Sequence, residues 1–111
     1  MVIGVLDIQG SVREHFNVLR SLHVEALLVK ENFKNLDGLI IPGGESTTIS
    51  TLLKLGGLDK KIAAFAKRGG IIFGTCAGAI LLAKNVFSGG VCDKRVKPLG
   101  LIDIDIDRNA Y

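Results

Sequence analysis

Four short apolar runs divide the chain and predict buried strands. They cover residues 2–8, 24–29, 38–41 and 71–73, and each is followed by polar residues, glycine or proline. Strands that are buried on both faces of a parallel sheet show continuous apolar runs of this kind, whereas strands with one wet face alternate apolar and polar positions. The runs therefore predict a parallel sheet, with residues 71–73 as a central strand.

The segments between these runs have apolar residues at helical spacing. Val12, Phe16, Leu19 and Leu22 recur at intervals of three and four residues, so they predict an amphipathic helix after the first strand. Three further helices are expected. The first covers residues 46–55, with the hydroxyls of residues 46–48 as N-caps. The second runs from the N-cap Asp59 to the glycines at 69–70, and the third covers residues 77–84.

The last part of the chain has a different pattern. Residues 99–107 alternate isoleucine with aspartate, so they predict a strand with one buried and one wet face. Residues 89–98 contain two glycines, a proline and the densest group of cations, and they predict an exposed loop in which Cys92 is a simple loop thiol.

Strands that alternate with helices predict one α/β domain over residues 1–111, a flavodoxin-like three-layer parallel sheet. Right-handed crossovers place helices on both faces of such a sheet. The loops that follow residues 8, 41 and 73 then emerge together at the carboxyl edge of the strands, where open α/β sheets bind their ligands. We therefore look for chemistry in these three loops.

Composition and charge narrow the function classes. Of the 111 residues 48% are hydrophobic, and no apolar run approaches the roughly 20 residues that span a bilayer, so we expect a soluble, cytoplasmic protein. The net charge of +3 comes from scattered cations without interleaved aromatic residues, which favours a solvated surface over a nucleic-acid partner. Both cysteines are expected as free thiols, and no His/Cys cluster has the spacing of a metal or cofactor site.

The segment G-T-C-A-G at residues 74–78 joins a predicted strand to a predicted helix and carries the most specific chemical signal. A nucleophile at such a turn adopts a strained backbone conformation, and the flanking glycines let the strand and the helix approach closely. Amide groups at the start of the helix favour a thiolate, so Cys76 is the expected nucleophile. The competing interpretation is a buried structural cysteine at a strand end.

Acyl transfer also needs hydrogen-bond donors for the oxyanion. The amide of Ala77, directly after the nucleophile, is one candidate. The P-G-G-E-S loop at residues 42–46 lets backbone approach a substrate without an intervening side chain, and we expect the amide of Gly44 as the second donor. The same loop also fits a plain strand-to-helix turn, while phosphate binding is disfavoured because no Walker-type lysine follows.

These motifs are shared with a known family. The shared segments are I-Q-G at residues 8–10 with R-E-H at 13–15, P-G-G-E-S-T-T at 42–48, G-T-C-A-G at 74–78 with L-L-A-K at 81–84, and D-R-N-A-Y at 107–111. Through them the sequence resembles the glutaminase subunits of pyridoxal 5′-phosphate synthase, the PdxT family of class I glutamine amidotransferases, and the resemblance runs along the whole chain. The first and the last of these segments separate this family from other class I amidotransferases.

The resemblance implies a subunit that hydrolyses L-glutamine to glutamate and ammonia through a cysteine thioester. The ammonia would pass to the synthase subunit PdxS for vitamin B6 synthesis. By position, Cys76 matches the nucleophile, while Gly44, Glu45 and Ser46 match the glutamine-binding loop. Arg108 matches a substrate-contacting arginine of the family.

The resemblance also implies a partner-facing region and an incomplete triad. Gln9, Gly10 and His15 match the segment that meets the synthase subunit. The histidine and glutamate of the family lie in a His-Pro-Glu segment beyond the position of Tyr111, so we expect a domain truncated at its C-terminal side and inactive alone. His15 is expected to orient groups or contact the partner, and His23 to lie at the surface.

Two other functions stay open. Without the triad histidine, the chain also fits a catalytically silent module that only binds the synthase subunit, which binding without turnover would reveal. A DJ-1/PfpI-type cysteine protein has a similar fold and elbow. That type typically carries an acidic residue after the first strand and a histidine after the cysteine, where this chain has Gln9 and Ala77.

Overall fold

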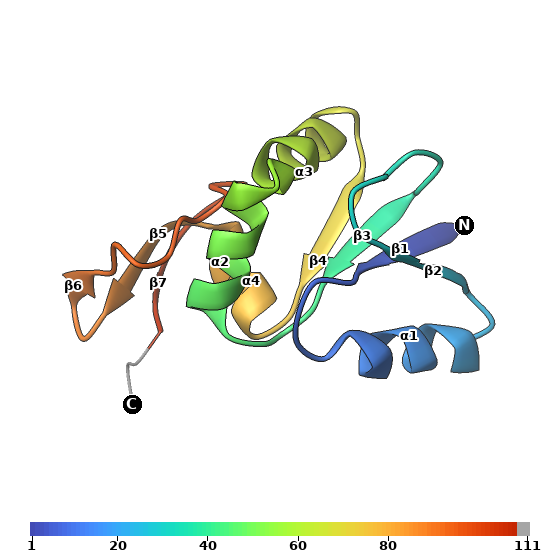
Figure 1. The fold of residues 1–111 in the computed structure, drawn as a ribbon, viewed down its shortest axis with the longest axis horizontal. Coiled ribbons are helices and arrows are strands. Elements are labelled where there is room, and N and C mark those ends of the chain that lie inside the picture. The colour runs from blue at the N-terminus through green and yellow to red at the C-terminus, as the bar shows by residue number, and fades with distance from the viewer. Residues whose placement is uncertain (109–111) are drawn as a thin grey trace.

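The computed structural model describes residues 1–108, which form the expected parallel sheet (Figure 1). Its strands are β1 (Val2–Leu6), β2 (Glu25–Val29), β3 (Gly38–Ile41) and β4 (Ile71–Gly74), in the order β2-β1-β3-β4. β1 pairs in parallel with β2 and with β3, and β3 pairs in parallel with β4. The α/β class and the parallel sheet predicted from the apolar runs are confirmed.

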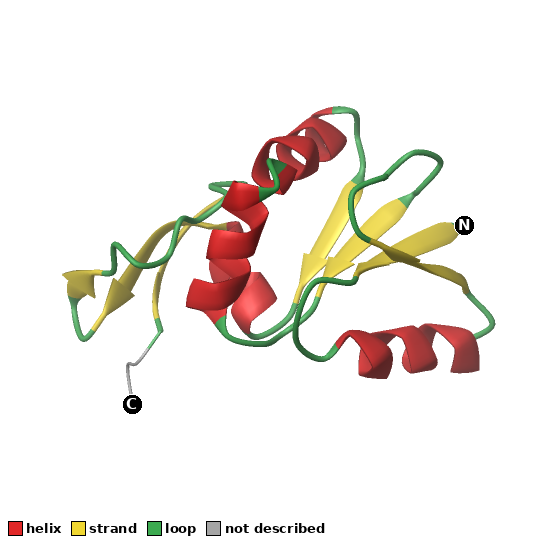
Figure 2. Ribbon diagram, in the orientation of Figure 1, coloured by secondary structure: helices red, strands yellow, loops and turns green. Residues whose placement is uncertain are grey.

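Helices cover both faces of this sheet (Figure 2). α1 (Val12–Ser21) lies on one face, and α2 (Ser46–Leu55), α3 (Leu58–Lys67) and α4 (Ala77–Leu82) lie on the other. The expected three layers are therefore present. None of the helices formed by residues 1–108 is both long and apolar enough to cross a membrane.

Two apolar clusters hold the layers together. The larger cluster lies between the sheet and α2, α3 and α4, each of which contributes a side chain that is almost fully buried: Leu53, Ile62 and Leu81. The smaller cluster joins Val12 of α1 to Val5 of β1. Both faces of the sheet thus bury apolar side chains, which explains the continuous apolar runs in its strands.

A second, smaller sheet follows α4. β5 (Ala83–Ser88) pairs antiparallel with β6 (Val91–Cys92) and parallel with β7 (Ile102–Asp107). Neither β5 nor β6 is predicted by the apolar pattern, and Cys92 lies in a strand rather than in a loop. Gly89 and Gly90, at φ of 60° and 82°, form the two-residue hairpin turn, and a Gly-Gly pair between β-prone residues is a known signal for such a turn.

The helix expected over residues 77–84 is shorter than predicted, because α4 ends at Leu82. The carbonyls of residues 81–83 accept hydrogen bonds from the amides of residues 99–101, at 2.7 to 3.0 Å. These carbonyls therefore belong to a tertiary contact, and the chain extends from Ala83 into β5. A local pattern carries no information about this partner.

Two helix starts also differ from the prediction. Glu45, rather than the hydroxyls of residues 46–48, caps α2, because its carboxylate accepts the Thr47 amide. Gly57, at φ of 68°, precedes the first residue of α3, so Asp59 lies within the first turn and is not the N-cap. Its carboxylate accepts the amide of Lys60 instead.

Three strands are more exposed than expected. In β2, Leu27 is 45% and Leu28 is 49% exposed. β4 is an edge strand rather than a central one within residues 1–108, with Ile71 72% and Phe73 56% exposed. In β7 the isoleucine face is not buried as predicted, since Ile102 and Ile104 are each 44% exposed. Only the end of β7 reaches the main core, through Ile106. An alternating pattern shows which side chains share a face, but not whether another layer covers that face.

Two leucines of α2 offer a matched test of this core. Leu53 is 1% exposed and Leu55 is 80% exposed. We expect Leu53→Ala to lower the free energy of unfolding by about 2 to 5 kcal/mol, because it leaves a cavity, and Leu55→Ala to change it by less than about 0.5 kcal/mol. Urea unfolding followed by circular dichroism measures both, and equal effects of the two substitutions would contradict the described core.

Candidate active site

The loops after β1, β3 and β4 meet at the carboxyl edge of the sheet, as expected. The Ser11 amide donates to the Gly43 carbonyl at 2.9 Å, which joins the first loop to the second. The Thr75 amide donates to the Ile41 carbonyl at 3.2 Å, which joins the third loop to the end of β3. Backbone hydrogen bonds therefore fix these three loops relative to one another.

Cys76 forms a strained turn at the start of α4. Its φ of 52° and ψ of −115° lie outside the ordinary regions for a residue with a side chain, and it is the N-cap of α4. Its thiol is free and the residue is exposed. A Cβ placed on Gly43 would lie 2.9 Å from the Cβ of Cys76, so the cysteine packs directly against the loop after β3. This position excludes the interpretation of a buried structural cysteine.

Glycines on either side of Cys76 allow this turn. A Cβ on Gly78 would lie 1.9 Å from the Ile41 carbonyl oxygen, and a Cβ on Gly74 would lie 2.6 Å from the Gly78 carbonyl oxygen. Both distances are far below van der Waals contact, and the clashing atoms belong to backbone that cannot move freely. The first turn of α4 therefore approaches β3 only because these positions carry no side chain.

One of the two amides expected to bind an oxyanion directly follows Cys76, and the other belongs to the loop that packs against it. Ala77 is the first residue of α4, where backbone N–H groups lack partners within the helix. The Gly43 carbonyl belongs to the same peptide unit as the Gly44 amide, and it accepts a hydrogen bond from the Ser11 amide. The C=O and the N–H of a planar trans peptide point in opposite directions, so the Gly44 N–H points away from Ser11.

Gln9 and Gly10 support the loop that contains Gly44. The Gln9 side-chain oxygen accepts the Glu45 amide at 3.1 Å. Gly10 has a φ of 95°, and a Cβ there would lie 1.8 Å from the Gly43 carbonyl oxygen. Only glycine fits this position, so the first loop holds the second one by close backbone contact.

His15 lies beside the elbow although it belongs to α1. Its Nε2 is 2.9 Å from the Thr75 hydroxyl oxygen, and Thr75 directly precedes Cys76. The residue is half-buried. This contact connects α1 to the strained turn and gives His15 an orienting contact at the elbow.

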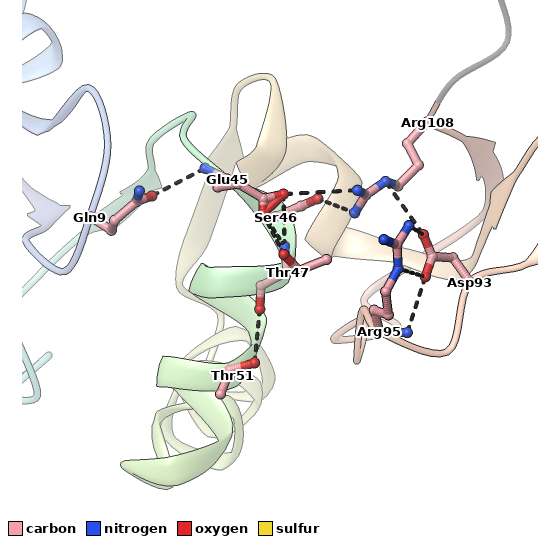
Figure 3. A network of polar contacts seen from close by, with 8 residues as sticks. All are labelled: Gln9, Glu45, Ser46, Thr47, Thr51, Asp93, Arg95 and Arg108. Carbon is pink, nitrogen blue, oxygen red and sulfur yellow. Dashed lines mark hydrogen bonds and ion pairs between the residues drawn. The ribbon is translucent and has the colours of Figure 1, made fainter.

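Arg108 reaches the start of α2 from the end of β7 (Figure 3). One of its terminal nitrogens donates to the Ser46 hydroxyl at 2.6 Å, and the other lies 3.8 Å from the Glu45 carboxylate. Its Nε lies 3.5 Å from the Asp93 carboxylate. The structure thus brings Arg108 next to Glu45 and Ser46, although Ser46 and Arg108 are 62 positions apart in the sequence. The rest of the matching D-R-N-A-Y segment, residues 109–111, lies outside the described residues.

Glu45 is held as a carboxylate. The Thr47 hydroxyl donates to it, and with the Thr47 amide and the charge of Arg108 this bond lowers the pKa of Glu45. An ionised Glu45 next to a guanidinium forms a pair of opposite charges of the kind that recognises the ammonium and carboxylate groups of an amino acid.

Asp93 and Arg95 belong to this cluster although the sequence pattern does not single them out. Arg95 forms two side-chain hydrogen bonds with the Asp93 carboxylate, each of 3.0 Å. These bonds, with the Arg95 amide and the charges of Arg95 and Arg108, lower the pKa of Asp93 to about 2. A D-x-R spacing in a polar stretch is too common to signal a site, and only the hairpin brings it to Arg108.

The described residues offer few other chemical groups. Within residues 1–108, no three or more His, Cys, Asp or Glu side chains are arranged to hold a metal ion. The second cysteine, Cys92, is free and exposed in β6.

The model of the SNO glutamine amidotransferase family matches residues 5–111. The chain belongs to this family. A PdxT pyridoxal 5′-phosphate synthase subunit of Dehalococcoides mccartyi is 53% identical over the whole chain, and that of Thermotoga maritima is 47% identical. A crystal structure of a glutamine amidotransferase superposes on the whole chain with a TM-score of 0.86 at 39% identity.

The chain spans only part of these family members. It covers 56% of the Dehalococcoides subunit, 57% of the Thermotoga subunit and 58% of the chain in the crystal structure. The resemblance to PdxT and the α/β amidotransferase fold are confirmed over that part.

The close approach at the elbow makes a specific prediction for two glycines. We expect Gly78→Ala to destabilise the fold by about 3 kcal/mol or more, because backbone must move to admit the new methyl group. Gly56 has a φ of −87° and ordinary contact distances of 3.5 Å and above, so Gly56→Ala is expected to stabilise by about 0.4 to 1 kcal/mol. Urea unfolding distinguishes the two, and a tolerated Gly78→Ala would contradict the described geometry.

The lowered pKa of Asp93 predicts a change of stability with pH. Because the pKa is about 2 in the folded chain against an ordinary 3.8, the ionised carboxylate stabilises the fold above pH 3.8. This contribution is lost as the pH falls towards 2. We expect Asp93→Asn to be less stable than the unmodified chain near neutral pH, and the difference between them to shrink below pH 3.8. Urea midpoints across this range measure it, and a constant difference would rule out the ionised pair.

Proposed function

We propose that this chain carries the nucleophile and the glutamine-binding loop of a glutaminase that supplies ammonia to a pyridoxal 5′-phosphate synthase. The observation that carries the proposal is the position of Cys76. Its exposed thiol sits at a strained turn, packed against the Gly43 backbone and followed by the first amides of α4. The relatives named PdxT and the SNO family support the same assignment.

In the proposed reaction the Cys76 thiolate attacks the side-chain carbonyl carbon of L-glutamine. The amides of Gly44 and Ala77 stabilise the oxyanion that forms, and the carbon–nitrogen bond breaks to release ammonia. Water then hydrolyses the glutamyl thioester, which gives glutamate and returns the thiolate. The strained turn contributes because it holds the sulfur in place before substrate arrives.

The charged groups at the start of α2 fit the amino-acid end of glutamine. The Arg108 guanidinium would pair with the α-carboxylate, and the Glu45 carboxylate with the α-ammonium group. The Ser46 hydroxyl, which accepts from Arg108, would keep that guanidinium oriented. These roles explain why two oppositely charged residues and a buried serine meet at this edge.

Proton transfer needs a histidine and an orienting acid, which the resemblance places beyond the position of Tyr111. His15 does not take this role in our proposal, because its ring contacts Thr75 rather than Cys76. We therefore propose that the 111-residue chain alone does not turn over glutamine. The proposed partner is PdxS, met through Gln9, Gly10 and His15, in the cytoplasm.

The contacts of Gln9 with the loop after β3 and of His15 with Thr75 favour a second candidate. They hold in place the residues that the resemblance matches to the synthase-facing segment, as a module that binds the synthase subunit without catalysis would need. Synthase binding by the 111-residue chain, together with the absence of ammonia release under the same conditions, would support this candidate for the short form.

The decisive substitution is Cys76→Ala in the natural full-length protein mixed with PdxS. We expect ammonia release from glutamine to fall by at least about a thousandfold, because no other group can form the thioester. Cys92→Ala is the matched control and is expected to keep full activity, since that thiol is exposed in β6 and belongs to none of the three loops. Unchanged ammonia release in Cys76→Ala would refute the proposal.

A further inference from the structure

We propose that Asp93 is a positioning residue for glutamine binding, which acts by holding the Arg108 guanidinium towards the start of α2. The inference rests on the proposed function, because it assumes that Arg108 takes the substrate carboxylate. It concerns a residue that neither the motifs nor the resemblance single out.

The Asp93 side chain is buried between two guanidinium groups. It is 3% exposed, and its Oδ2 lies 3.0 Å from a terminal nitrogen of Arg95 and 3.5 Å from Nε of Arg108. The Arg108 side chain is itself only 14% exposed. A buried carboxylate is costly unless charged partners satisfy it, so this arrangement constrains both side chains.

Arg95 fixes the orientation of the Asp93 carboxylate. The Arg95 amide and Nε both donate to Oδ1 at 3.0 Å, while a terminal nitrogen donates to Oδ2 at 3.0 Å. Three hydrogen bonds from one residue prevent the carboxylate from rotating. Its Oδ2 therefore stays turned towards Arg108.

The backbones of Asp93 and Arg108 are held by neighbouring residues of β5. The Asp93 amide donates to the Val86 carbonyl and the Arg108 amide to the Phe87 carbonyl, each at 2.9 Å. The loop after Asp93 is tied to α2 as well, because the Lys97 amide donates to the Ser50 hydroxyl at 2.6 Å. The hairpin of β5 and β6 thus places the carboxylate at a fixed distance from the start of α2.

A planar guanidinium transmits this constraint. With Nε facing Asp93, the two terminal nitrogens of Arg108 lie towards Ser46 and Glu45, as Figure 3 shows. Their paired N–H groups then form a preorganised site for a carboxylate. Without Asp93 the long side chain could adopt other rotamers, and part of the binding free energy would be spent on ordering it.

The direction in which Asp93→Asn changes glutamine affinity distinguishes a positioning role from a purely electrostatic one. Asp93 and Glu45 carry two negative charges and Arg95 and Arg108 two positive ones, so the cluster is neutral. Asp93→Asn would leave it positive, and long-range attraction alone would then bind an anionic substrate group more tightly. Positioning predicts the opposite, namely weaker binding of glutamine.

The test measures glutamine kinetics of the natural full-length protein with PdxS. We expect Asp93→Asn to raise KM about tenfold with kcat changed less than about twofold, since the ion pair that orients Arg108 is lost. Arg95→Gln, which leaves the carboxylate but frees it to rotate, is expected to raise KM about threefold. The matched control is Lys94→Gln, an exposed cation in the same turn, which is expected to leave both constants unchanged.

A double-mutant cycle shows whether the effect passes through Arg108. In an Arg108→Gln background, Asp93→Asn is expected to change KM by less than about twofold, because the group that it positions is gone. If Asp93→Asn raises KM in the Arg108→Gln background as much as it does alone, its role is generally structural and the inference is overturned. Unchanged or lower KM in single Asp93→Asn would overturn it too. If Asp93→Asn does not fold, Arg95→Gln decides, and an unchanged KM in that variant overturns the inference.

The same assay separates this inference from the proposed function. Ammonia release that is absent from the wild-type complex, or that survives Cys76→Ala, refutes the proposed function. Ammonia release that depends on Cys76, together with a KM that does not depend on Asp93, refutes only the positioning role.

Discussion

The close approach between the backbone of Gly78 and the Ile41 carbonyl is the contact on which the site depends. It brings the first turn of α4 against the end of β3, at a distance that no side chain at position 78 would allow. The chain can reach this position from β4 only through the unusual backbone angles of Cys76. The strain at the cysteine is therefore a consequence of helix packing, offset by the core that α4 completes with Leu81 and Leu82.

The binding side of the site has a different origin. The start of α2 supplies Glu45 and Ser46, but Arg108 directly follows β7 of the second sheet, whose strand β5 joins the main core through Ala83 and Val86. This sheet holds Arg108 and Asp93 through neighbouring carbonyls of β5 and connects to α2 through Ser50. We infer that its main task is to deliver a buried, oriented guanidinium to the loop after β3.

Much of the main sheet follows from the sequence alone, because its strands are continuous apolar runs and the helices between them carry apolar side chains at helical spacing. The cysteine elbow and the glycine loop are also visible there, since their steric demands select glycine at fixed spacings. The second sheet is not predictable in the same way. The end of α4 depends on hydrogen bonds from residues 99–101, and the pairing of Asp93 with Arg108 depends on β7, which brings Arg108 back beside β5. Residue types indicate the local conformation well, but the partner of a polar group can be identified only once the fold is known.

The most direct test of the central claim is mass spectrometry of the natural full-length protein with PdxS, quenched with acid during turnover of glutamine. A thioester intermediate predicts that the protein gains the mass of one glutamyl group, and that peptide mapping locates it on Cys76. A modification found on Cys92 instead, or complete absence of the adduct while ammonia is being released, would contradict the account.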